Sequence, residues 1–162
     1  MKQRRERCVY LTIALVYLIT AVYICLHHIN KGTTQYLFMG PVSLLFLLAP
    51  PLAEKVFRQP LGFGFKVFTL VFCYFAFSLG VALRWYDQSD IYDKAMHLIS
   101  GLLFFCLGFY FFSRFDKRNA AYSLTDNWVL QMTYAFFFSM TIAVVWEIYE
   151  FMGFVLLGPD AQ

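Results

Sequence analysis

Long apolar runs separated by short polar segments form the main pattern along this chain. Because a helix needs about 20 residues to cross roughly 30 Å of hydrocarbon, each run is a candidate membrane span. The runs cover residues 8–29, 36–53, 63–86, 92–112 and 128–157. We therefore predict an all-α protein, a polytopic transmembrane helical bundle with about five spans.

Two of the runs depart from a simple crossing. The second contains Pro41 and the pair Pro50-Pro51, which interrupt helical hydrogen bonding, so we expect a kinked or partly inserted segment. The fifth is longer than a straight crossing requires. We expect it either to tilt strongly or to leave the membrane near Glu147.

The composition supports a membrane protein. Hydrophobic residues make up 60% of the 162 residues and charged residues only 14%, whereas soluble domains carry about 25% charged residues. The few polar side chains cannot cover a soluble core. Residues 1–162 are therefore predicted to form a single integral membrane domain whose main partner is the lipid bilayer. The 4 cysteines are scattered, which argues against a disulfide framework.

Basic residues indicate the orientation of the chain, because cytoplasmic loops are enriched in Lys and Arg. With a cytoplasmic N-terminus, all 13 basic residues except Lys31, Arg84 and Lys94 fall on the inner side. The inner residues are Lys2, Arg4, Arg5, Arg7, Lys55, Arg58, Lys66, Arg114, Lys117 and Arg118. We predict an N-in, C-out multi-pass protein, and we interpret the net charge of +3 as a topology signal rather than a nucleic-acid site.

Two polar clusters interrupt the apolar pattern. Asp93-Lys94-x-x-His97 opens the fourth run, and Glu147-x-x-Glu150 lies in the fifth. A charged side chain in hydrocarbon costs about 2.5–3.5 kcal/mol, so such residues are functional candidates. Spacings of four and three residues place each pair on one helix face. At 1.5 Å per residue, Glu147 lies about 29 Å beyond Trp128, near the extracytoplasmic edge. The fourth run starts outside near Tyr92, so His97 lies about one turn below the same edge.

Small residues beside the clusters predict that the fourth and fifth spans pack together. They are Ser100, Gly101, Gly108, Ser139 and Ala143. This packing would close a polar pocket formed by Arg84, Asp93, Lys94, His97, Glu147 and Glu150.

Three chemistries suit that pocket. The first is binding of a divalent metal ion, with His97, Asp93, Glu147 and Glu150 as candidate ligands. The second is acid–base or metal-assisted catalysis, in which His97 and Glu147 act as ligand or base while Asp93 and Glu150 orient them. The third is capture of a polar lipid or cell-envelope headgroup. The residues leave open whether the protein is an enzyme.

Structural interpretations compete with these roles. Asp90 is a candidate helix N-cap, and Asp93 a first-turn carboxylate favoured by the helix dipole. Arg84 and Lys94 are candidates for structural ion pairs, and His27 and His28 are expected at the membrane interface.

Two other functional classes also stay open. One is a small transporter or permease subunit with Glu147, Glu150 and His97 as a proton or cation relay. The other is a structural partner in a membrane complex, either with another membrane protein or as a homo-oligomer.

The two clusters also carry a family resemblance. Tyr92-Asp93-Lys94-x-x-His97, followed by Gly101, and Trp146-Glu147-x-x-Glu150-Phe151 resemble the YjdF-like membrane proteins of bacteria. They are similar, more distantly, to VanZ-like proteins, which share the Asp-Lys-x-x-His start and a later intramembrane glutamate. The resemblance covers roughly residues 90–162.

The resemblance implies a small multi-pass protein of the bacterial cytoplasmic membrane without an established activity. VanZ-like proteins are associated with glycopeptide (teicoplanin) resistance, an association that supplies no mechanism. Such proteins usually continue after the glutamate motif with an Asp-rich segment and a further helix. The end of this chain at residues 158–162 therefore implies a C-terminally truncated or divergent member.

Overall fold

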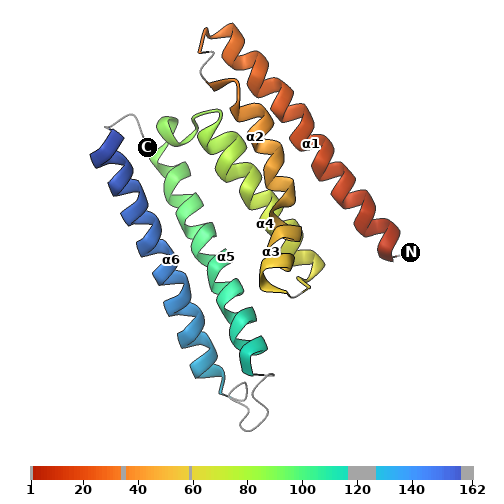
Figure 1. Cartoon of the computed structure of the whole chain (residues 1–162), viewed down its shortest axis with the longest axis vertical. Coiled ribbons are helices and arrows are strands. Elements are labelled where there is room, and N and C mark those ends of the chain that lie inside the picture. The colour runs from red at the N-terminus through yellow and green to blue at the C-terminus, as the bar shows by residue number, and fades with distance from the viewer. Residues whose placement is uncertain (1, 34–35, 59, 117–126, 158–162) are drawn as a thin grey trace. The chain divides into compact units, whose positions relative to one another are not determined.

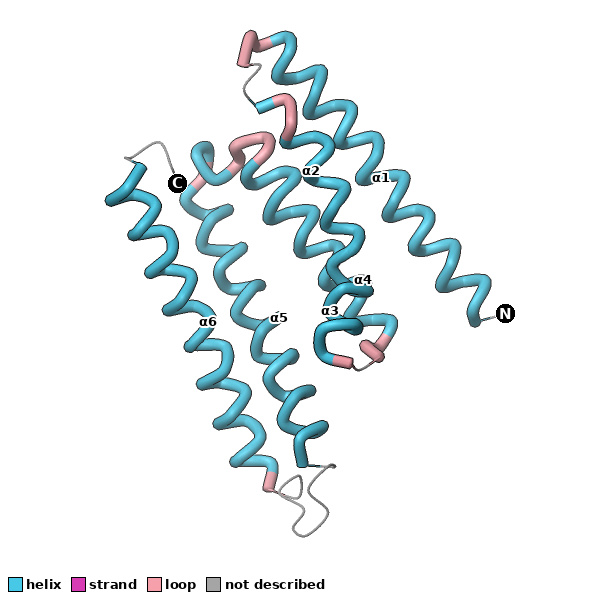
Figure 2. The backbone as a smooth tube through the Cα atoms, viewed as in Figure 1, coloured by secondary structure: helices cyan, strands magenta, loops and turns pink. Residues whose placement is uncertain are grey.

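A computed structural model describes residues 2–33, 36–58, 60–116 and 127–157. Within these ranges every regular element is a helix (Figure 2), which confirms the all-α prediction. Lys117, Arg118 and the C-terminal segment 158–162, on which parts of the topology and truncation predictions rest, lie outside the described residues.

The chain divides into two compact units, Met1–Met96 and His97–Gln162, and the boundary falls within one helix. Each unit is described by itself below. The prediction of a single integral membrane domain stays a prediction.

Unit Met1–Met96 begins with a long helix and continues with shorter ones (Figure 1). Its elements are α1 (Lys2–Asn30), α2 (Met39–Leu45), the 3-10 helix η2 (Phe46–Leu48), α3 (Ala49–Phe57), α4 (Phe63–Cys73), the π-helix η3 (Tyr74–Val81), the 3-10 helix η4 (Tyr86–Gln88) and the start of α5 (Asp90–Asp116). Unit His97–Gln162 contains the rest of α5 and the helix α6 (Trp128–Leu157).

Four helical segments of the described chain are long and apolar enough to cross a membrane. They are Gln3–Asn30, Phe63–Val81, Asp90–Ser113 and Trp128–Met152. In each of them only 17% of the most apolar window is buried within the protein. Large apolar side chains of these segments, such as Leu11, Ile91, Leu98 and Phe137, are exposed. Apolar surface on this scale is expected to face lipid.

The second predicted span is not one continuous α-helix. It is divided into α2, η2 and α3, none of which meets the length of a crossing by itself. Pro50 and Pro51 occupy the first turn of α3, where their missing N–H groups are tolerated, but they cannot continue an α-helical ladder from the preceding residues. The α2 piece approaches α1 closely, because a Cβ on Gly40 would lie 2.6 Å from Cys25 Sγ.

The third predicted span ends earlier than residue 86. Helix α4 passes directly into η3, which ends at Val81, and Arg84 follows in the left-handed region with φ of 59°. The ring of Tyr86 lies against Gly80 so closely that a Cβ there would overlap it. A tight turn that requires glycine therefore replaces the last helical turn that hydropathy alone predicts.

Polar side chains join the helices of unit Met1–Met96 to one another. The Tyr17 hydroxyl donates to the Leu70 carbonyl at 2.7 Å, and the Thr20 and Tyr74 hydroxyls lie 2.8 Å apart. The Tyr92 hydroxyl donates to the Phe75 carbonyl of η3 at 2.7 Å. Because hydrocarbon offers no water, hydrogen bonds made inside the protein are the means of satisfying such groups.

Within unit His97–Gln162, α5 lies beside α6 (Figure 1). A Cβ added to Gly108 would lie 3.1 Å from Ala135 Cα and 2.9 Å from Phe138 Cδ1. The Ser139 hydroxyl donates to the Gly101 carbonyl at 2.8 Å. The predicted contact through small residues is therefore confirmed at these positions. Ala143, in contrast, is exposed.

Candidate functional site

Local capping sets where α5 and α6 begin. The Ser89 hydroxyl accepts a hydrogen bond from the Tyr92 N–H at 3.3 Å, and Asn127 Oδ1 accepts one from the Leu130 N–H at 3.1 Å. Ser89, rather than Asp90, is therefore the N-cap of α5, which corrects the sequence interpretation by one residue. Asp90 and Asp93 occupy the first turn, where the helix dipole favours carboxylates.

One group of potential metal-ligand side chains is present among the described residues, and it lies in unit His97–Gln162. His97 of α5 and Glu147 and Glu150 of α6 each offer one ligand atom, and these atoms lie within 4.8 Å of one another. Three of the residues singled out from the sequence are thus brought together. They come from positions about 50 residues apart in the chain, so the α5–α6 pairing creates the group.

Neighbouring side chains form hydrogen bonds with two residues of this cluster. The Trp146 indole Nε1–H donates to Glu150 Oε1 at 2.8 Å, which leaves the second carboxylate oxygen of Glu150 for another partner. The Ser100 hydroxyl donates to the His97 backbone carbonyl at 2.8 Å, one turn along α5. Sequence reasoning quoted Trp146 only as part of a motif. Its spacing of four residues from Glu150 is the signal that would have identified the hydrogen bond between these two side chains.

The surroundings of the cluster are mainly apolar. Glu147 contributes the single carboxylate to a shallow depression along α6, whose other lining residues are Met140, Ala143, Val144, Ile148 and Phe151. His97 and Glu147 are exposed, and Glu150 is half-buried. A cation or headgroup therefore has open access to the ligand atoms.

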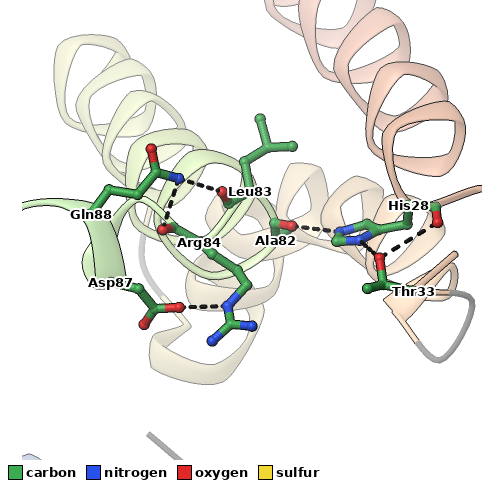
Figure 3. Close-up of polar contacts among 7 residues, drawn as sticks. All are labelled: His28, Thr33, Ala82, Leu83, Arg84, Asp87 and Gln88. Atoms are coloured by element: carbon green, nitrogen blue, oxygen red, sulfur yellow. Dashed lines mark hydrogen bonds and ion pairs between the residues drawn. The ribbon is translucent and has the colours of Figure 1, made fainter. Parts of the chain in front are cut away.

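The remaining predicted pocket residues belong to unit Met1–Met96 and are not members of the three-residue group. Asp93 is half-buried and Lys94 is exposed, both on the first turns of α5. Arg84 forms an ion pair with Asp87, three residues further along (Figure 3). For Arg84 the structural interpretation therefore has direct support.

His28, expected at the membrane interface, is buried within the protein at the end of α1. Its side chain is 3% exposed, Nε2 lies 2.8 Å from the Ala82 carbonyl oxygen, and Nδ1 lies 2.8 Å from Thr33 Oγ1 (Figure 3). Because a carbonyl only accepts, Nε2 carries the proton and donates it. His28 therefore connects the end of α1 to the turn after η3, whereas the neighbouring His27 is half-exposed.

The fold and the apolar helices define the class of this protein, an α-helical integral membrane protein. The chain belongs to a family described as predicted membrane proteins (DUF2238), whose model matches residues 9–162. The YjdF-like proteins are this family, so that resemblance is confirmed, while the VanZ-like similarity stays an interpretation. No curated protein and no solved structure significantly matches the chain.

Proposed function

We propose that this integral membrane protein binds a divalent metal ion through His97, Glu147 and Glu150. The observation that carries the proposal is the convergence of one imidazole and two carboxylates within 4.8 Å on two paired helices. Nitrogen and oxygen donors of this kind suit zinc or manganese. A carboxylate pair at this distance also favours a cation electrostatically, because the two negative charges repel each other without one.

The spacing of the ligand atoms is compatible with coordination after small side-chain rotations. Ligand atoms about 2.0–2.2 Å from a zinc ion lie roughly 3.3–3.6 Å from one another in a tetrahedral site. Three protein ligands leave a fourth position open, as in catalytic rather than structural zinc sites. When bound, the ion would polarise water or a headgroup oxygen at that position.

Trp146 is the residue that we assign to positioning of the site. Its indole N–H holds Glu150 Oε1 and so restricts the rotation of the carboxylate. Outer hydrogen bonds of this kind typically change metal affinity by about 10–100-fold. Asp93, four residues before His97 on α5, stays the candidate orienting partner of the imidazole, as the spacing predicts.

We place the site at the extracytoplasmic edge of the membrane. Helix α6 is continuous from Trp128 to Leu157, which supports the estimate that Glu147 lies about 29 Å beyond Trp128. A site at this depth would meet water, ions and lipid headgroups while its walls remain apolar.

Metal analysis of the purified full chain tests the proposal. We expect close to one equivalent of zinc or manganese after exposure to the metal and removal of excess. His97→Ala, Glu147→Gln and Glu150→Gln should each lower affinity at least roughly tenfold, and Trp146→Phe by about 10–100-fold. The matched controls His27→Ala and Glu6→Gln, at a half-exposed histidine and glutamate of α1, should retain the metal.

Two results would remove the metal proposal. One is equal metal content in the His97→Ala and Glu147→Gln variants and the parent protein. The other is the absence of zinc or manganese binding by a parent protein that unfolds cooperatively. A role of the cluster in fixing helix register alone predicts that these variants lose thermal stability without any metal-dependent difference.

A further inference from the structure

A second charged region lies at the beginning of α1 and at the connection between α3 and α4. Arg4, Arg5 and Arg7 are exposed on the first turns of α1, and Lys55 and Arg58 are exposed at the end of α3. We call these five residues the basic surface. All belong to unit Met1–Met96.

Packing within this unit brings the two basic segments to one end. The rings of Tyr10 on α1 and Phe63, the first residue of α4, lie 5.8 Å apart in an edge-to-face contact. The α3–α4 connection is therefore beside the third turn of α1. Arg7 lies one turn before Tyr10, and Arg58 lies five residues before Phe63.

The carboxylates near the basic surface are fewer than its five cations: Glu6 lies between Arg5 and Arg7, and Glu54 precedes Lys55. Glu54 accepts from Lys66 Nζ at 2.6 Å and from the Leu61 N–H at 2.8 Å, so its charge is already engaged. Among the described side chains, no salt bridge joins any of the five cations of the basic surface to an acid.

The position of these cations along the helices matches the membrane interface. Arg7 directly precedes the apolar run that begins at Cys8, and Lys55 and Arg58 follow the apolar segment of α2 and α3. Lys and Arg beside a bilayer attract anionic headgroups, each contributing roughly a fivefold increase in affinity at low salt. A zwitterionic headgroup offers no comparable net charge.

We propose that the basic surface binds the phosphate headgroup of an anionic phospholipid. The five cations and the engaged Glu54 form a surface with strong positive charge at the level where lipid phosphates lie. The lipid site is separate from the metal site in sequence and in chemistry, and it does not depend on metal binding.

Short-chain lipids can be titrated against the full chain purified in an uncharged detergent. We expect dioctanoyl phosphatidylglycerol to bind, detected as adducts by native mass spectrometry, and dioctanoyl phosphatidylcholine to bind at least about tenfold more weakly. Lys55→Gln should weaken phosphatidylglycerol binding roughly fivefold, and Arg4→Gln/Arg5→Gln/Arg7→Gln by at least about tenfold. Lys31→Gln, at the opposite end of α1, is the matched control and should bind like the parent.

Three outcomes would overturn the proposal. They are equal binding of the two lipids, equal losses in Lys55→Gln and Lys31→Gln, and binding of inorganic phosphate as tight as that of phosphatidylglycerol. Thermal unfolding of each variant separates a loss of binding from a loss of folding. The single Lys55→Gln variant keeps the test valid if the triple variant does not fold.

Discussion

At the scale of single residues, His28 illustrates how a polar side chain can be structural in a membrane protein. It lies in the last turn of the apolar helix α1, yet its ring is buried and both nitrogens have hydrogen-bonding partners. Nε2–H donates to the Ala82 carbonyl, and Nδ1 forms a hydrogen bond with the Thr33 hydroxyl. The cost of burying the imidazole is thus offset by two hydrogen bonds.

We predict that His28→Ala destabilises the protein by about 1–3 kcal/mol, because the Ala82 carbonyl loses its donor and a buried volume is left empty. Thermal or denaturant unfolding of the detergent-purified protein measures this effect. His27→Ala is the matched control, since that ring is half-exposed, and it should cost less than about 1 kcal/mol. Equal losses in the two variants would contradict the structural role of His28.

At the scale of elements, small residues determine how closely α5 approaches α6. Gly101 and Gly108 lie two turns apart on α5, but their surroundings differ. A Cβ on Gly101 would have Ser139 Oγ as its nearest neighbour, at 4.0 Å, whereas a Cβ on Gly108 would crowd Phe138 and the Ala135 backbone. The helix pair is therefore closer at Gly108 than at Gly101, and the cluster of His97, Glu147 and Glu150 depends on that pairing.

We expect Gly108→Ala to destabilise the α5–α6 pair by about 1–3 kcal/mol, since overpacking forces backbone or ring shifts. The change should also weaken metal binding, because the ligands come from both helices. Unfolding and metal titration measure the two effects. Gly101→Ala on the same helix should be neutral or slightly stabilising, because alanine is the better helix former and has room there. The opposite ranking of these two variants would refute the packing argument.

The elements also show how far local patterns predict this fold. The length of the apolar runs located the long helices, because hydrocarbon requires an uninterrupted hydrogen-bonded helix of that length. It did not locate the end of η3 at Val81, where Gly80 accommodates the Tyr86 ring. Nor did it show that the second segment divides into α2, η2 and α3, although its prolines indicated a break.

At the scale of the whole molecule, the number of crossings decides on which side each loop lies. Four segments qualify as spans by themselves, and the divided segment α2–η2–α3 is the fifth in our topology. With five crossings the two termini lie on opposite sides of the membrane, and with four they share a side. The basic residues favour the five-span arrangement with a cytoplasmic N-terminus.

We predict that a topology reporter fused after Gln162 reads as extracytoplasmic, while one fused before Met1 reads as cytoplasmic. Paired enzymatic reporters, each active on one side only, measure this in intact cells. A reporter inserted after Gly32 should be extracytoplasmic and serves as the control for the first crossing. A cytoplasmic reading at both termini would show that α2–η2–α3 does not cross, and would place the metal site on the inner side.

The sequence by itself determined the helical class, the approximate spans and the helix faces that carry His97, Glu147 and Glu150. Hydrocarbon length and helical periodicity are local constraints, so they can be evaluated one segment at a time. Only the tertiary structure decided that both glutamates meet His97 and that His28 is buried. Those outcomes depend on the rotation and separation of helices far apart in the chain, which close contacts such as Gly108 with Ala135 set.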